Sequence, residues 1–110
     1  MRIEEIRAAL DNNIPVEFTA HCQKRMIERG ISRADIFSCI YRGEIIEDYP
    51  LDINNTSPNS LPSCLILGVR IVDNKAIHLV IGFNGRKILM ISACYPDTDH
   101  WYEDFKTRRK

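Results

Sequence analysis

SCLILGVRIVDNKAIHLVIGFNGRKILMISACY, residues 63–95, decides the fold class of this chain. Apolar and β-branched residues recur there with the period of two that is typical of strands. Asp73-Asn74 and Asn84-Gly85 divide the stretch and are typical hairpin turns. The sequence therefore predicts an antiparallel meander of three strands, over residues 63–72, 75–83 and 86–95.

Helical patterns precede this meander. Residues 3–10 have the apolar spacing of a short amphipathic helix. Thr19 is a predicted N-cap for a helix over 20–29, which Gly30 ends. Ser32, with Asp35 three residues later, predicts a capping box for a third helix that ends before Gly43.

The remaining segments complete an α+β fold. Residues 44–49 read as a first strand, 50–61 as a polar connection, and Asp99 as the cap of a short C-terminal helix after Pro96. We expect a single domain over residues 1–110, with two to three N-terminal helices packed on one face of a four-stranded antiparallel β-sheet.

Strand alternation assigns side chains to the two faces of the predicted sheet. One apolar set, Ile77, Leu79, Ile81 and Phe83, is expected to meet the helices, which leaves His78 on the other face. The preceding strand is expected to do the same with Leu65, Leu67, Val69 and Ile71.

Composition excludes several classes of protein. The 110 residues are 45% hydrophobic, which argues against disorder, and are too few for a two-domain enzyme. No signal peptide or membrane span is visible, so we expect a cytoplasmic protein with no membrane partner. The four Cys lie far apart, which predicts free thiols, no metal site and no cofactor.

Charge is balanced in total but not locally. Lys and Arg number 15 and Asp and Glu number 15, so no global excess of cations favours nucleic acid. Cations nevertheless outnumber carboxylates in residues 19–43 and in the tail, 106–110. Any phosphate-binding role must therefore depend on local charge.

The predicted helix over 20–29 carries the most informative pattern. His21, Arg25 and Arg29, spaced i, i+4 and i+8, lie in one line beside the apolar face. Guanidinium groups bind phosphate oxygens and an imidazole can move a proton near neutral pH. The alternative is that Glu28, Asp35 or the acidic residues in 44–52 pair with these cations in salt bridges.

Other candidate residues lie on the predicted strands and in the tail. His78 is either a second acid/base group or a structural histidine. Ser92 and Tyr95 supply hydroxyl groups at the rim of the sheet. Lys106 and Arg109 either bind a nucleic-acid backbone or belong to a frayed terminus.

Five short motifs carry a resemblance to a known family over roughly residues 18–105. They are HCQKRMIERGI (21–31), GEIIEDYP (43–50), CLILG (64–68), IHLV (77–80) and SACYP (92–96). The chain resembles small uncharacterised prokaryotic proteins similar to the barnase/RelE-type toxin superfamily, although Ser92 stands where Thr is expected. Such proteins often have an antitoxin-like partner, and the resemblance implies cleavage of RNA without a metal.

The implied reaction is attack of a ribose 2′-hydroxyl on its own phosphate. On that reading, His21 acts as one acid/base group, His78 acts as the second or orients the first, and Arg25 binds the phosphate. The remaining substrate-binding residues are Arg29, Ser92, Tyr95, Lys106 and Arg109. His21 lies on a predicted helix, whereas His78 is expected on the sheet face remote from the helices. If the two lie far apart, we keep the line of His21, Arg25 and Arg29. The alternative is a non-catalytic module of the same fold that binds RNA or a protein.

Overall fold

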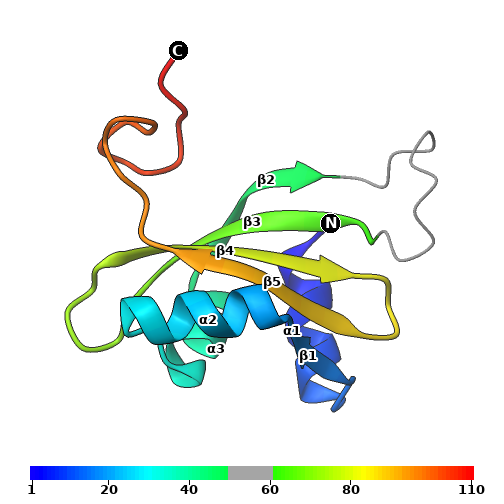
Figure 1. Ribbon diagram of the computed structural model, residues 1–110. Coiled ribbons are helices and arrows are strands. Elements are labelled where there is room, and N and C mark those ends of the chain that lie inside the picture. The colour runs from blue at the N-terminus through cyan, green and yellow to red at the C-terminus, as the bar shows by residue number, and fades with distance from the viewer. Residues whose placement is uncertain (50–60) are drawn as a thin grey trace.

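Three helices and five strands follow one another in the computed structural model, which describes residues 1–49 and 61–110. They are α1 (Ile3–Asp11), β1 (Val16–Phe18), α2 (Ala20–Arg29), α3 (Arg33–Arg42), β2 (Glu44–Tyr49), β3 (Ser63–Val69), β4 (Ala76–Phe83) and β5 (Ile88–Cys94). The helices lie against one face of the sheet, and the residues after β5 extend over the other (Figure 1). Of the polar connection predicted over 50–61, residues 50–60 lie outside the described part of the chain.

The predictions of α2 and α3 are confirmed, including their caps. The Thr19 hydroxyl accepts from Cys22 N–H, and Gly30 ends α2 in the left-handed conformation with φ 65°. Ser32 and Asp35 form the reciprocal capping box at the start of α3. Among the described residues, no helix is long and apolar enough to cross a membrane.

The predicted four-stranded antiparallel sheet is wrong, because the sheet is five-stranded and mixed. Its order is β1-β5-β4-β3-β2, and β1 pairs in parallel with β5 through Val16↔Ile88 to Phe18↔Met90. The other neighbouring pairs are antiparallel, as expected. A three-residue strand is too short to show a period, and its partner lies some 70 residues later in the chain, so no local pattern revealed β1.

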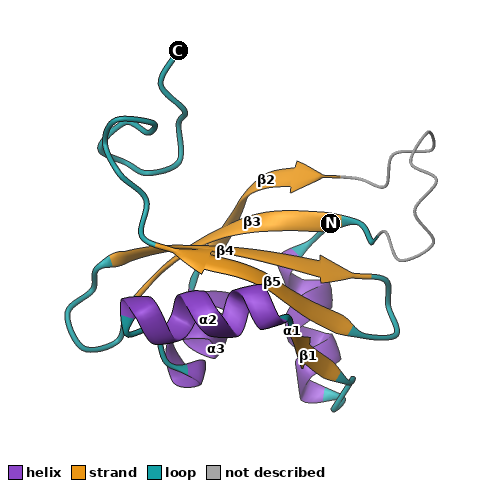
Figure 2. Cartoon of the chain, in the orientation of Figure 1, coloured by secondary structure: helices purple, strands orange, loops and turns teal. Residues whose placement is uncertain are grey.

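The predicted C-terminal helix is also wrong. Residues after Cys94 form turns and no helix (Figure 2). The Asp97 carboxylate accepts from the backbone N–H groups of Asp99 and His100, and Asp104 does the same for the two residues after Phe105. These local bonds compete with helical ones, so Asp97 and Asp104 close turns where Asp99 was predicted to cap a helix.

The sheet faces are as predicted for β4 but reversed for β3. Ile77, Leu79 and Ile81 are buried in the helix-side core together with Cys64 and Ile66, so Leu65 and Leu67 lie on the other face. Gly68 explains the difference. A Cβ at Gly68 would stand 2.7 Å from Cys39 Cα, so a glycine is needed where α3 crosses β3.

Candidate nucleic-acid interface

The outer border of α2 presents the predicted line of cationic and titratable side chains. Cys22 and Met26 form the adjacent buried face of the helix, which packs over β5. His21 is exposed at the first turn, and Arg25 and Arg29 follow at successive turns. The helical period therefore places the three side chains in one line, as the sequence predicted.

Arg25 makes an exposed ion pair within its own helix. Its Nη1 lies 2.8 Å from Glu28 Oε2, and the two side chains are 37% and 43% exposed. The salt bridge considered from the sequence is therefore present. Exposed pairs of this kind contribute only about 0–1 kcal/mol, so a phosphate can replace the carboxylate at low cost.

Arg29 has a structural partner on the sheet. Because β1 pairs with β5 only as far as Met90, the next carbonyls of β5 need other donors. Thr19 Oγ1 donates to Ile91 O at 3.1 Å, and Arg29 Nη1 donates to Ala93 O at 2.8 Å. Arg29 thus joins α2 to the free edge of β5 and has further N–H groups for a ligand.

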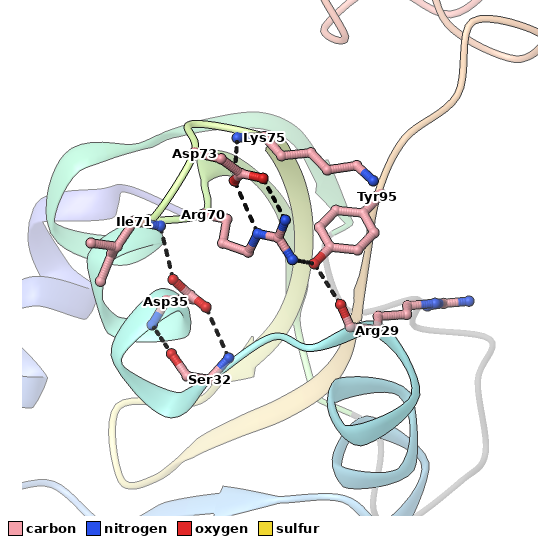
Figure 3. Close-up of polar contacts among 8 residues, drawn as sticks. All are labelled: Arg29, Ser32, Asp35, Arg70, Ile71, Asp73, Lys75 and Tyr95. Carbon is pink, nitrogen blue, oxygen red and sulfur yellow. Dashed lines mark hydrogen bonds and ion pairs between the residues drawn. The ribbon is translucent and has the colours of Figure 1, made fainter.

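Tyr95 connects the end of α2 with the turn between β3 and β4 (Figure 3). Its hydroxyl donates to Arg29 O at 2.6 Å and accepts from Arg70 Nη1 at 2.9 Å. Lys75 Nζ lies 4.2 Å from the centroid of the Tyr95 ring. Two predicted site residues, Arg29 and Tyr95, are therefore brought together, and two cations that the sequence analysis did not single out join them.

Arg70 and Lys75 are held in place by the turn itself. Arg70 N–H donates to Lys75 O at 2.8 Å, and the Arg70 guanidinium pairs with Asp73. That pairing with Arg70 lowers the pKa of Asp73 to about 2. The turn spans residues 70–75, longer than the two-residue hairpin predicted at Asp73-Asn74, because β3 ends three residues earlier and β4 begins one residue later than predicted. The sequence feature that could have indicated these two residues is the pair of cations on either side of the predicted turn.

Asp35 fixes the same turn to the start of α3 (Figure 3). Its side chain is 5% exposed, and its carboxylate accepts from the backbone N–H groups of Ser32 and Ile71, each at 2.9 Å. Burial by itself raises the pKa of Asp35, but these hydrogen bonds outweigh it and the pKa lies below its ordinary value. Asp35 is thus a structural anion, and it does not pair with the α2 cations.

His78 lies on the face of the sheet opposite α2. Its Nε2–H donates to Phe105 O at 2.7 Å, and its ring meets Trp101 edge to face with centroids 4.5 Å apart. Burial lowers the pKa of His78, partly offset by the bond to Phe105. The expectation that His78 faces away from the helices is confirmed, so His21 and His78 do not share a site.

The remaining predicted site residues are also separated from the α2 line. Ser92 pairs with Val80 and therefore shares the face of His78. Lys106 Nζ pairs with Glu44 at 2.6 Å, and Arg109 Nε donates to Trp101 O at 3.1 Å. These tail cations are engaged within the protein and are not a frayed terminus.

The arrangement offers cations for an anion but no assembled acid/base pair. Across residues 1–49 and 61–110, no three His, Cys, Asp or Glu side chains gather in a way that could hold a metal ion. Arg70 and Lys75 supply positive charge beside Tyr95. Arg25 and Arg29 lie on the adjoining α2, where the carbonyl of Arg29 accepts from Tyr95. Such a border can bind a nucleic-acid backbone through its cations and a base through the aromatic ring.

Comparison with known proteins gives one match. Residues 18–95 match a family model described as "Domain of unknown function (DUF4258)". No curated protein and no solved structure matches the chain. The matched range includes α2 and ends at Tyr95, whereas α1 and the C-terminal residues lie outside it. The description names no activity, so the resemblance to barnase/RelE-type toxins stays a prediction.

Proposed function

Since this chain belongs to the DUF4258 family of domains of unknown function, we propose its function from the site: it binds RNA through the outer border of α2 and the adjoining Tyr95. One observation carries the proposal. Arg25 and Arg29 lie in line with exposed His21, and the contacts of Tyr95 extend that line to Arg70 and Lys75.

The charge of this border suits a phosphate backbone. Arg25 has only an exposed intrahelical partner, and Lys75 makes no ion pair with a carboxylate of the described residues. Guanidinium groups bind phosphate oxygens in a fixed geometry, whereas the Lys ammonium adds a mobile point charge. We propose RNA and not DNA as the ligand because of the resemblance to ribonuclease toxins.

A second candidate, a metal-independent endoribonuclease, is favoured by the position of His21. It stands one helical turn before Arg25, so a group that can move a proton lies beside a group that can bind the phosphate. His78 lies across the sheet and cannot act together with His21. In this version His21 is the sole histidine at the scissile phosphate.

The test is binding of a fluorescently labelled single-stranded RNA 12-mer, measured by fluorescence anisotropy at low salt. Arg25→Gln is expected to weaken binding about tenfold, since a charge-assisted phosphate contact is lost. Arg86→Gln removes an exposed guanidinium from the turn before β5 and is the matched control. With about three phosphate contacts, log Kd should change with log salt by a slope of only about 2.

The same samples separate binding from cleavage. RNA cut in EDTA to 2′,3′-cyclic phosphate ends, with the cutting lost in His21→Ala, supports the endoribonuclease. Binding without cutting supports the module. Absence of RNA binding at low salt, or equal losses in Arg25→Gln and Arg86→Gln, contradicts both.

A further inference from the structure

A shallow groove lies along the border of α2 opposite the line of cations. It has a volume of about 240 Å³ and is lined by Phe18, Gln23, Met26, Ile27, Ile31 and Arg33. Ile27 follows Arg25 by two residues, which is about 200° around the helix, so the groove and the RNA-binding border point away from each other.

The exposure of Ile27 is unusual for its position. It lies in the middle of α2 and is 83% exposed, although the helix would form equally well with a polar residue there. Met26 and Ile31 beside it are 8% and 4% exposed, so the floor of the groove belongs to the core. Ile27 thus forms one apolar side of the groove, and no described residue of this chain covers it.

The other wall is rigid and positively charged. Phe18 packs edge to face against Phe37, with ring centroids 6.4 Å apart. The Arg33 guanidinium lies 4.5 Å from the centroid of the Phe18 ring on the groove side. Lys24 is exposed one turn before Ile27, so both cations flank the groove.

The groove itself is lined by one charged side chain, the cation Arg33. No carboxylate lines it, and neither Lys24 nor Arg33 makes an ion pair with a carboxylate of residues 1–49 or 61–110. A volume of about 240 Å³ is below the range of about 300–1,000 Å³ that holds small molecules, so it fits an anchoring side chain and not a whole ligand.

We propose that this groove docks an acidic segment of a partner protein. One apolar side chain of the segment lies between Phe18 and Ile27, and carboxylates on either side of it pair with Lys24 and Arg33. Apolar burial supplies the affinity, and the charges select the partner and favour its encounter. The inference does not rest on RNA binding, because it uses the other border of α2.

The experiment selects peptides from a random 12-residue display library on the wild-type protein, with removal of those that also bind Ile27→Glu. We expect enrichment of peptides with an apolar residue flanked by Asp or Glu. A synthetic peptide of the enriched sequence should bind at least about tenfold more weakly to Ile27→Glu and about threefold more weakly to Arg33→Gln. Val72→Glu changes an equally exposed apolar residue, 81% exposed in the β3–β4 turn, and should bind as the wild type does.

Three outcomes overturn the proposal. The first is that no peptide is enriched, or that the enriched peptides are basic or lack an apolar residue. The second is a wild-type dimer in sedimentation equilibrium that Ile27→Glu dissociates, which makes a second copy the occupant. The third is a loss of RNA affinity in Ile27→Glu as large as that in Arg25→Gln, which makes the groove part of the RNA surface.

Discussion

Arg25 and Arg29 occupy equivalent positions one turn apart on α2, yet their replacement by Gln should have unequal effects on stability. Arg29 donates from a partly buried guanidinium to Ala93 O, at the edge of β5 that β1 leaves unpaired. A hydrogen bond from a charged donor contributes about 1.5–3 kcal/mol. Arg25 loses only an exposed pair with Glu28, about 1 kcal/mol or less.

These values convert to measurable shifts in melting temperature. For a domain of this size about 1 kcal/mol corresponds to about 4 °C. Thermal unfolding followed by circular dichroism should give a loss of about 6–12 °C for Arg29→Gln and less than about 4 °C for Arg25→Gln. Exposed Arg86→Gln is the control and should change Tm by no more than about 2 °C.

The result that would refute this reasoning is an equal loss for the two α2 variants. It would mean that water satisfies the Ala93 carbonyl when Arg29 is absent, so the contact does not hold α2 to the sheet. The unequal result also makes Arg25→Gln the cleaner binding variant, since loss of RNA affinity then occurs in a folded protein.

Three further predictions concern the sheet and its second face. Gly68→Ala should lower the free energy of urea unfolding by about 3 kcal/mol, because the new methyl group would meet the backbone of Cys39 on α3; Val72→Ala, at an exposed site, should change it by less than about 0.5 kcal/mol. The pKa of His78 is lowered by burial, so the folded state binds fewer protons than the unfolded state as pH falls below about 6.5. The free energy of unfolding should therefore fall as the pH is lowered through that range. In urea unfolding between pH 7.5 and 5, His78→Gln should show a smaller change of this free energy with pH than the wild type. Trp101→Ala should cost about 3 kcal/mol and make the residues after β5 sensitive to limited proteolysis, because the ring at 7% exposure holds them against the sheet; unchanged proteolysis would contradict that role.

Local signals predicted the helices well. The caps at Thr19 and Ser32 involve groups within three residues of each other, so they need no tertiary contact. The same is true of the i, i+4 line on α2. The family match from residue 18 to 95 covers this part of the chain without assigning it an activity.

Features that depend on distant partners were missed. Alternation could not decide which side of β3 faces the helices, because Cys64 and Ile66 are as apolar as Leu65 and Leu67. The predicted C-terminal helix was wrong because Asp97 and Asp104 accept from the backbone of turns on either side of Trp101, which packs against His78 on the sheet.

The sequence by itself determined that His21, Arg25 and Arg29 lie in one line, since that follows from 3.6 residues per helical turn. Only the tertiary structure decided what the line does. It bound Arg29 to the edge of β5, brought Arg70 and Lys75 to Tyr95, and packed Trp101 against His78. The physical reason is that a sheet pairs residues far apart in the chain, and such pairing produces no pattern among neighbouring residues.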